Sequence, residues 1–318
     1  MPDRTAPTQH LTRGYLIAAV SALILSTTGI FIRVLTQTYL MPPLVLAFWR
    51  DTLVALVLLP ALALRRPARL AVRRRDLLYL VGYGLVLAVF NALWTLSVAL
   101  NGAAVATVLV YSSAAFTAVL GRWLLAERLG WVKLVAVGVS LAGCALVSGA
   151  LEASAWRANL LGISTGVLSG LLYAAYSVLG RAASQRGLDP WTTVLFTFAS
   201  AAVFLAALNA LPGGWVPGAA ARAADFLWLG DRVSGWAILF ALAAGPTVIG
   251  FGLYNVSLAY LPSSVANVIL TTEPVFTAAI AYALLGERLS TAQVAGSAMI
   301  LSGVVFLRLH ERSAPART

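Results

Sequence analysis

Long runs of apolar residues, separated by short polar stretches, recur along the whole chain. Each run holds about 20 residues, the length an α-helix needs to cross a hydrocarbon core of about 30 Å. The runs show no period of two, so the strands of a transmembrane barrel are not predicted. We expect membrane-spanning helices over residues 14–35, 44–64, 77–98, 103–125, 131–150, 159–181, 190–211, 235–259, 264–286 and 291–309. The predicted fold class is an all-α integral membrane protein with ten transmembrane helices.

The segments 1–13 and 310–318 lie outside these spans and are rich in Pro, Thr, Ser and Ala. Such a composition at the chain ends is typical of disordered tails. The first apolar run follows a weakly basic front and no evident small-residue cleavage site, so we expect a retained helix.

Composition excludes a soluble domain, because 60% of the 318 residues are hydrophobic and only 10% are charged, against about 25% in soluble domains. The net charge of +11 does not indicate nucleic acid, since most of the basic residues lie in short loops beside helix ends on one side of the membrane. The positive-inside rule makes that side cytoplasmic and places both termini there. With the single cysteine, Cys144, inside a span, neither a disulfide, nor a metal site, nor a cofactor is expected.

The chain also repeats itself. A shift of 160 residues brings the words FTA and ERL of the first half, at Phe116 and Glu127, onto the same words in the second half. Each copy holds five spans, and because five is odd, the second copy enters the membrane from the opposite side. We predict two inverted five-helix repeats, over residues 14–150 and 159–309. Secondary transporters are often built in this way, with the substrate site near the midplane between the repeats.

Two segments resemble a known family. Residues 267–306, NVILTTEPVFTAAIAYALLGERLSTAQVAGSAMILSGVVF, resemble the signature end of an EamA-type domain of the drug/metabolite transporter superfamily, and residues 108–147 are similar to a second, weaker copy. The resemblance implies a carrier, usually an exporter of amino acids or other small metabolites in a bacterial inner (plasma) membrane. Family members often have proline in both copies, whereas this chain has Pro274 but Ala114. The kink in the fourth helix of the first copy is therefore expected to be absent.

Glu273 is the one charge in the span 264–286, and it lies about 14 Å from one membrane face. A carboxylate at this depth costs about 2.5–3.5 kcal/mol unless a cavity or a partner receives it, and burial favours the neutral acid. It is either a protonatable or cation-binding group on the transport route, or a protonated acid that ties helices together. Pro274 behind it removes a backbone donor and is expected to bend the helix, and Pro246 is expected to act as a second hinge.

Arg50 and Asp51 lie about seven residues inside the second span and point about 100° apart. One of them is expected to line the cavity while the other binds a neighbouring helix. With Glu273 they leave one excess negative charge, which a proton or a cationic substrate group would relieve. An amino acid fits this balance, with its carboxylate at Arg50. We predict Glu273 and Asp51 as proton-coupling groups, with a structural salt bridge at Arg50 and Asp51 as the alternative.

Other polar and aromatic residues within the spans are candidates for substrate binding, although each also suits packing or hydrogen bonding between helices. Together with Glu273 and Arg50, the predicted substrate-binding set comprises Asn91, Trp94, Tyr111, Tyr173, Tyr176, Tyr254, Asn255, Asn267 and Thr271.

Two further features have a structural interpretation. Glycines at 162, 166 and 170 form a small-residue face that is expected to pack closely, either between the two halves or in a dimer. Glu127 with Arg128, and Glu287 with Arg288, follow the fourth span of each copy in tight loops. We expect these charged pairs to fix loop geometry and not to bind substrate.

Energy from ATP is not predicted, because no G-x-x-x-x-G-K-[ST] loop is present and the one lysine is Lys133. We expect an alternating-access carrier whose two five-helix units rock around a site at Glu273. The alternatives are uptake or facilitated transport by the same fold, a channel, a scaffold and a membrane-embedded enzyme. The enzyme is disfavoured because clusters of His or Cys and long loops are lacking. Expected partners are a small-molecule substrate, membrane lipid and protons, with the chain as a monomer or a homodimer.

Overall fold

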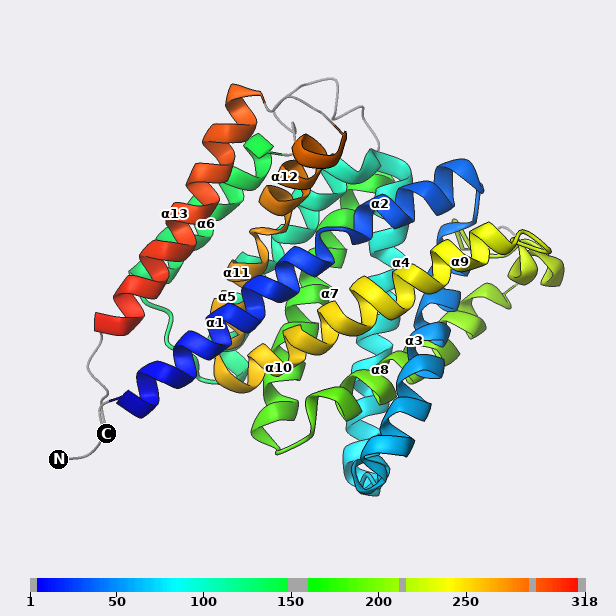
Figure 1. Cartoon of the computed structure of the whole chain (residues 1–318), viewed down its shortest axis with the longest axis horizontal. Helices are drawn as coiled ribbons and strands as arrows, with labels where there is room; N and C mark the ends of the chain where they lie inside the picture. The colour runs from blue at the N-terminus through cyan, green and yellow to red at the C-terminus, as the bar shows by residue number, and fades with distance from the viewer. Residues whose placement is uncertain (1–4, 148–159, 212–215, 286–289, 314–318) are drawn as a thin grey trace.

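The computed structural model describes residues 5–147, 160–211, 216–285 and 290–313, and these residues form helices and no strand. The predicted all-α class is confirmed. The first half contains α1 Thr5–Leu25, α2 Thr28–Arg33, the π-helix η1 Val34–Thr38, α3 Pro43–Arg65, the 3-10 helix η2 Pro67–Leu70, α4 Arg74–Tyr111, α5 Ser113–Leu124 and α6 Trp131–Val147 (Figure 1). The second half contains α7 Leu160–Gln185, α8 Pro190–Asn209, the 3-10 helix η4 Ala223–Leu227, α9 Val233–Leu242, the π-helix η5 Ala243–Phe251, α10 Gly252–Tyr260, α11 Ser263–Leu270, α12 Glu273–Leu285 and α13 Thr291–Ser313.

Seven helical segments in the described part of the chain are long and apolar enough to cross a membrane. They are Leu11–Thr38, Pro43–Arg65, Arg74–Leu100, Ala106–Leu124, Leu160–Gln185, Pro190–Asn209 and Val233–Tyr260, and two shorter apolar helices are Trp131–Leu146 and Thr291–Leu307. Each of these segments overlaps one predicted span. The remaining predicted span, 264–286, is interrupted between α11 and α12.

The chain reverses direction within α4, between the third and fourth predicted spans. A Cβ atom placed on Gly166 of α7 would lie 2.8 Å from the Ser97 hydroxyl oxygen and 2.7 Å from the Cβ of Leu109. A straight helix would separate Ser97 from Leu109 by about 18 Å. The two residues therefore return to the same point on α7, and the third and fourth spans lie beside each other.

Helices of the two halves pack against one another in matching pairs. The fifth spans of the two halves, α6 and α13, lie side by side at one edge of the bundle, and the second spans, α3 and α8, also pair (Figure 1). The first span of each half packs on the third span of the other, α1 on α10 and α7 on α4. This arrangement follows the internal sequence repeat, because each of these pairings recurs when the halves are exchanged.

The small-residue face of α7 packs against α4 of the other half. A Cβ on Gly170 would lie 3.0 Å from the Leu109 carbonyl oxygen and 3.2 Å from that of Val110. Such contacts are tighter than van der Waals packing allows, and backbone atoms cannot turn away as a side-chain end can. These contacts match the expectation that the glycines pack between the two halves.

Replacement of Gly170 by leucine is expected to destabilise the fold by more than about 1–3 kcal/mol, the usual cost of overpacking a well-filled core. The measurement is the thermal transition of the purified protein in detergent, followed by size-exclusion chromatography. Gly138→Leu is the matched control, because a Cβ there meets no atom within 4 Å. Equal losses in the two variants would contradict the proposed contact.

Both ends of the chain are more helical than the sequence suggests. α1 begins at Thr5, inside the segment 1–13 that was expected to be a disordered tail. Leu11 packs on the core, and the Arg13 guanidinium carbon lies 5.4 Å from the centre of the Tyr260 ring. These contacts extend the helix beyond its apolar run. α13 likewise continues into the predicted carboxyl-terminal tail, as far as Ser313.

The fourth span of each half is interrupted at an equivalent position, so the expected absence of a kink in the first half is wrong. α11 and α12 are separated at Thr271 and Thr272, and α4 and α5 are separated at Ser112, which lies 160 residues before Thr272. A hydroxyl group lies at the break in both halves. The Ser112 hydroxyl donates to the carbonyl three residues earlier at 2.6 Å, and the Thr271 and Thr272 hydroxyls do the same at 2.6 and 2.7 Å. Such bonds compete with the helical ladder and do not require proline.

Candidate functional site

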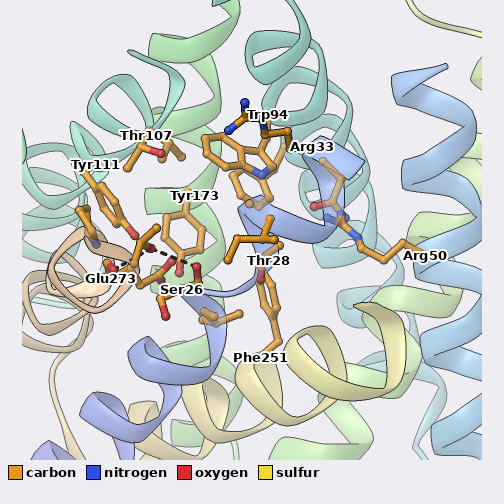
Figure 2. A pocket seen from close by; sticks show the side chains of 18 residues that line it. Ser26, Thr28, Arg33, Arg50, Trp94, Thr107, Tyr111, Tyr173, Phe251 and Glu273 are labelled. Atoms are coloured by element: carbon orange, nitrogen blue, oxygen red, sulfur yellow. Dashed lines mark hydrogen bonds between the residues drawn. The ribbon is translucent and has the colours of Figure 1, made fainter. Parts of the chain in front are cut away.

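A cavity of about 230 Å³ lies between the two halves, beside the interruptions of their fourth spans (Figure 2). Its polar lining consists of Ser26, Thr28, Arg33, Arg50, Asn91, Trp94, Thr107, Tyr111, Tyr173, Glu273 and Thr277. The apolar lining consists of Leu25, Gly29, Ile30, Phe90, Val110, Phe251 and Pro274. An apolar enclosure with a few convergent polar groups is the usual form of a small-molecule site.

Glu273 enters this cavity because the helix restarts there. It is the first residue of α12, where the unpaired backbone amides and the helix dipole favour a negative group. The Tyr111 side chain, from the equivalent interruption in the first half, lies next to its carboxyl group (Figure 2). Glu273 is half-buried and lines the cavity, so it neither points into lipid nor lies in sealed packing.

A hydrogen bond ties the start of α12 to the interruption between α1 and α2. The Thr277 hydroxyl lies 3.0 Å from the Ser26 carbonyl oxygen and 3.1 Å from the carbonyl oxygen of Glu273 (Figure 2). Pro274 is the second residue of α12, where its missing N–H costs no helical hydrogen bond. Pro246 lies within the π-helix η5, so both proline hinges predicted from the sequence coincide with irregular helix geometry.

Arg50 and Asp51 divide their roles as expected. Arg50 lines the cavity, whereas Asp51 turns toward α4 and accepts a hydrogen bond of 2.7 Å from the Asn91 amide. The Arg50 Nε atom lies 3.2 Å from Asp51 Oδ1, and the two side chains are 2% and 0% exposed. Asp51 therefore balances and holds the guanidinium group and does not itself line the cavity.

The structure brings six members of the predicted substrate-binding set together at the cavity: Glu273, Arg50, Asn91, Trp94, Tyr111 and Tyr173. The other five, Tyr176, Tyr254, Asn255, Asn267 and Thr271, are buried outside the cavity lining.

Four of these five belong to a buried hydrogen-bond network between α7, α10 and α11. Tyr254 and Asn267 both donate to the Ser177 hydroxyl, at 2.7 and 3.1 Å. The Asn255 amide donates to the Tyr176 hydroxyl at 2.8 Å. Tyr176 and Tyr254 stack on Tyr173, which lines the cavity, so the network lies directly behind the lining and is not part of it.

Several lining residues were missed from the sequence. They are Ser26, Thr28, Arg33, Phe90, Thr107, Phe251 and Thr277. A usable signal existed for the first of these, because the polar run STTG, residues 26–29, interrupts the apolar first span where α1 gives way to α2. Arg33, near the end of the predicted span 14–35, ends α2 and is exposed at the cavity.

Glu127 joins the two halves, so its role extends beyond the loop geometry that was expected of it. One carboxylate oxygen accepts from the Ser263 amide and hydroxyl, both at 2.7 Å, and the other accepts from the Ser264 hydroxyl at 2.6 Å and amide at 3.3 Å. Lys133 donates to the Ser264 hydroxyl at 3.1 Å. The equivalent Glu287 lies outside the described residues.

We call Glu127, Ser263 and Ser264 the latch. The carboxylate caps the start of α11 with a charge that the helix dipole favours. A second contact joins the halves through the ion pair of Arg69 and Asp189.

The chain was compared with known proteins. Residues 12–149 and 160–309 each match the model of the EamA-like transporter family. An uncharacterized transporter from Archaeoglobus fulgidus is 28% identical over 223 residues, which cover 69% of this chain and 73% of that protein. An uncharacterized transporter from Synechocystis is 26% identical over 236 residues, 74% of this chain and 68% of that protein. A crystal structure of a protein with 19% identity has a TM-score of 0.73 over 95% of this chain and 99% of that one, a likeness of fold.

Proposed function

Because the chain belongs to the EamA-like transporter family, we propose that it is a secondary active transporter that exports amino acids or related small metabolites by alternating access. The proposed setting is a bacterial inner membrane, crossed by ten helices in two inverted five-helix repeats, with both termini in the cytoplasm. The observation that carries the proposal is the cavity between the halves, with Glu273 at an interrupted helix. Interrupted helices at a repeat interface are the usual binding sites of such carriers.

The latch supports an outward-facing conformation in this orientation. The latch residue Glu127 and its neighbour Lys133 belong to the loop region that the positive-inside rule assigns to the cytoplasm. The exposed Arg33 lines the cavity from the other end of the first span. The latch would then close the cytoplasmic route while the cavity faces outward. Opening of the latch, with closure near Arg33, would give the inward-facing state.

Glu273 supports coupling to protons. A half-buried carboxyl in a small cavity binds either a proton or a cationic group, and not both, because each neutralises the same charge. A proton arriving from outside would displace the ammonium of an exported amino acid, and the empty protonated carrier would return. The outcome is exchange of substrate for a proton.

The test is transport by the purified protein in vesicles, with a panel of radiolabelled amino acids and related metabolites. We expect at least one substrate to accumulate in vesicles with an acidic lumen, because protons leave as substrate enters, and a protonophore is expected to abolish the accumulation. Accumulation that requires an alkaline lumen would indicate proton-coupled uptake, and gradient-independent equilibration would indicate facilitated transport. Substrate-independent current would indicate a channel, and product formation without transfer would indicate an enzyme.

A further inference from the structure

Three buried polar atoms on the cavity lining have no hydrogen-bond partner in the structure: Arg50 Nη2, Asn91 Oδ1 and Thr28 Oγ1. Leaving such atoms unpaired costs free energy, most of all for a charged group. All three belong to residues that line one cavity, so a polar ligand in that cavity is a candidate partner for them.

The cavity lining also carries a positive charge beyond the pair of Arg50 and Asp51. Asp51 balances Arg50 through the Nε atom, which leaves the Nη2 atom available. Arg33 lines the same cavity, and its Nε donates to the neutral amide of Gln37 at 3.1 Å. The ion pairs found among the described residues do not include Arg33, so it adds one positive charge to the cavity lining.

The negative group of the cavity lies away from Arg50. Figure 2 shows Glu273 with Tyr111 on one side of the pocket and Arg50 on the opposite side. Arg50 makes its ion pair with Asp51 and not with Glu273. The aromatic rings of Phe90, Trp94 and Phe251 belong to the lining as well. The cavity therefore presents a basic end, an acidic end and aromatic walls.

We propose that Arg50 and Thr28 form a binding site for a carboxylate of the transported molecule, with Asp51 as the residue that positions Arg50. The site rests on the proposed transport function and specifies the chemistry of its substrate. The Arg50 Nη2 group donates to one carboxylate oxygen and the Thr28 hydroxyl donates to the other. Asn91, held by its bond to Asp51, keeps its carbonyl oxygen as an acceptor for an N–H group of the same ligand.

Binding of matched probes to the full-length protein in detergent tests the site. The probes are 3-phenylpropionate, which has only the carboxylate, phenethylamine, which has only the ammonium, and L-phenylalanine, which has both. Quenching of the intrinsic tryptophan fluorescence reports binding, because Trp94 lines the cavity. The variant is R50Q/D51N, which removes both charges of the buried pair and leaves neither of them uncompensated.

We expect the wild type to bind both carboxylate probes and the double variant to bind them at least about tenfold more weakly, with phenethylamine changed less than about twofold. Arg232→Gln, which removes an exposed arginine outside the cavity lining, is expected to change none of the affinities. The melting temperature of each variant is measured alongside, so that a folding defect is recognised.

Three results would overturn the carboxylate site: no binding of either carboxylate probe to the wild type, unchanged carboxylate binding in the double variant, or equal loss of all three probes. Vesicle transport distinguishes this failure from failure of the proposed function. Transport of cationic metabolites that does not depend on Arg50 would leave the carrier standing without the carboxylate site. Arg50-dependent carboxylate binding without transport of any metabolite would leave the site standing without the carrier.

Discussion

Replacement of Glu273 by glutamine is expected to abolish accumulation of substrate driven by a pH gradient. Glutamine keeps the size of the side chain and a polar group next to Tyr111, but it binds neither a proton nor an ammonium as a charged partner. Loss of a hydrogen bond to a charged group costs about 1.5–3 kcal/mol, so substrate affinity is expected to fall by roughly 10–150-fold. The accumulation ratio in vesicles with an acidic lumen is expected to fall to about one.

The measurement compares wild type, Glu273→Gln and Asp231→Asn in the same vesicles, with and without a pH gradient. Asp231 is exposed and lies outside the cavity lining, so its variant controls for loss of one carboxylate. The same proton dependence in Glu273→Gln and wild type would remove the coupling role. If that variant instead lowers the melting temperature and leaves coupling intact, Glu273 is an acid that ties helices together.

The length and composition of the apolar runs predicted the helices well. Each helix must satisfy its backbone hydrogen bonds within the bilayer, so about 20 apolar residues specify a span almost without regard to context. The internal repeat could also be recognised in the sequence, because its detection depends on sequence identity alone. The position of Glu273 at the cavity followed from its cost in lipid, which requires a cavity or a partner.

Rotation of helices about their axes could not be predicted in the same way. Tyr173 and Tyr176 are three residues apart on α7, yet Tyr173 lines the cavity and Tyr176 joins the buried network beside it. Which face meets a cavity depends on the neighbouring helices, whose positions a single sequence does not contain. The interruption at Ser112 was missed for a related reason. The Ser112 hydroxyl bonds the carbonyl three residues earlier, but Ser169 in α7 and Ser302 in α13 make the same bond inside unbroken helices, so a serine alone does not predict a break.

No local sequence pattern predicts the latch, since Glu127 and Ser263 are 136 residues apart. Glutamine at position 127 is expected to favour the state in which the latch is open. In glutamine, an NH2 group, which is a donor, replaces one of the two carboxylate oxygens. This donor faces the backbone N–H of either Ser263 or Ser264, which cannot rotate away, so one hydrogen bond of the latch is lost. A loss of about 1.5–3 kcal/mol would shift the equilibrium between the two states by roughly 10–150-fold.

Cysteine labelling measures this shift. Ser177→Cys, in a background where Cys144 is replaced by alanine, puts a thiol into the buried network next to the cavity. Its reaction with a polar maleimide in nanodiscs is expected to be at least about tenfold faster with Glu127→Gln, because the route past the latch opens more often. Asp225→Asn is the matched control. Its carboxylate also accepts two backbone amides, at 2.8 and 2.9 Å, but both lie within its own loop. Equal rates in all three proteins would mean that Glu127 shapes its loop and does not control access.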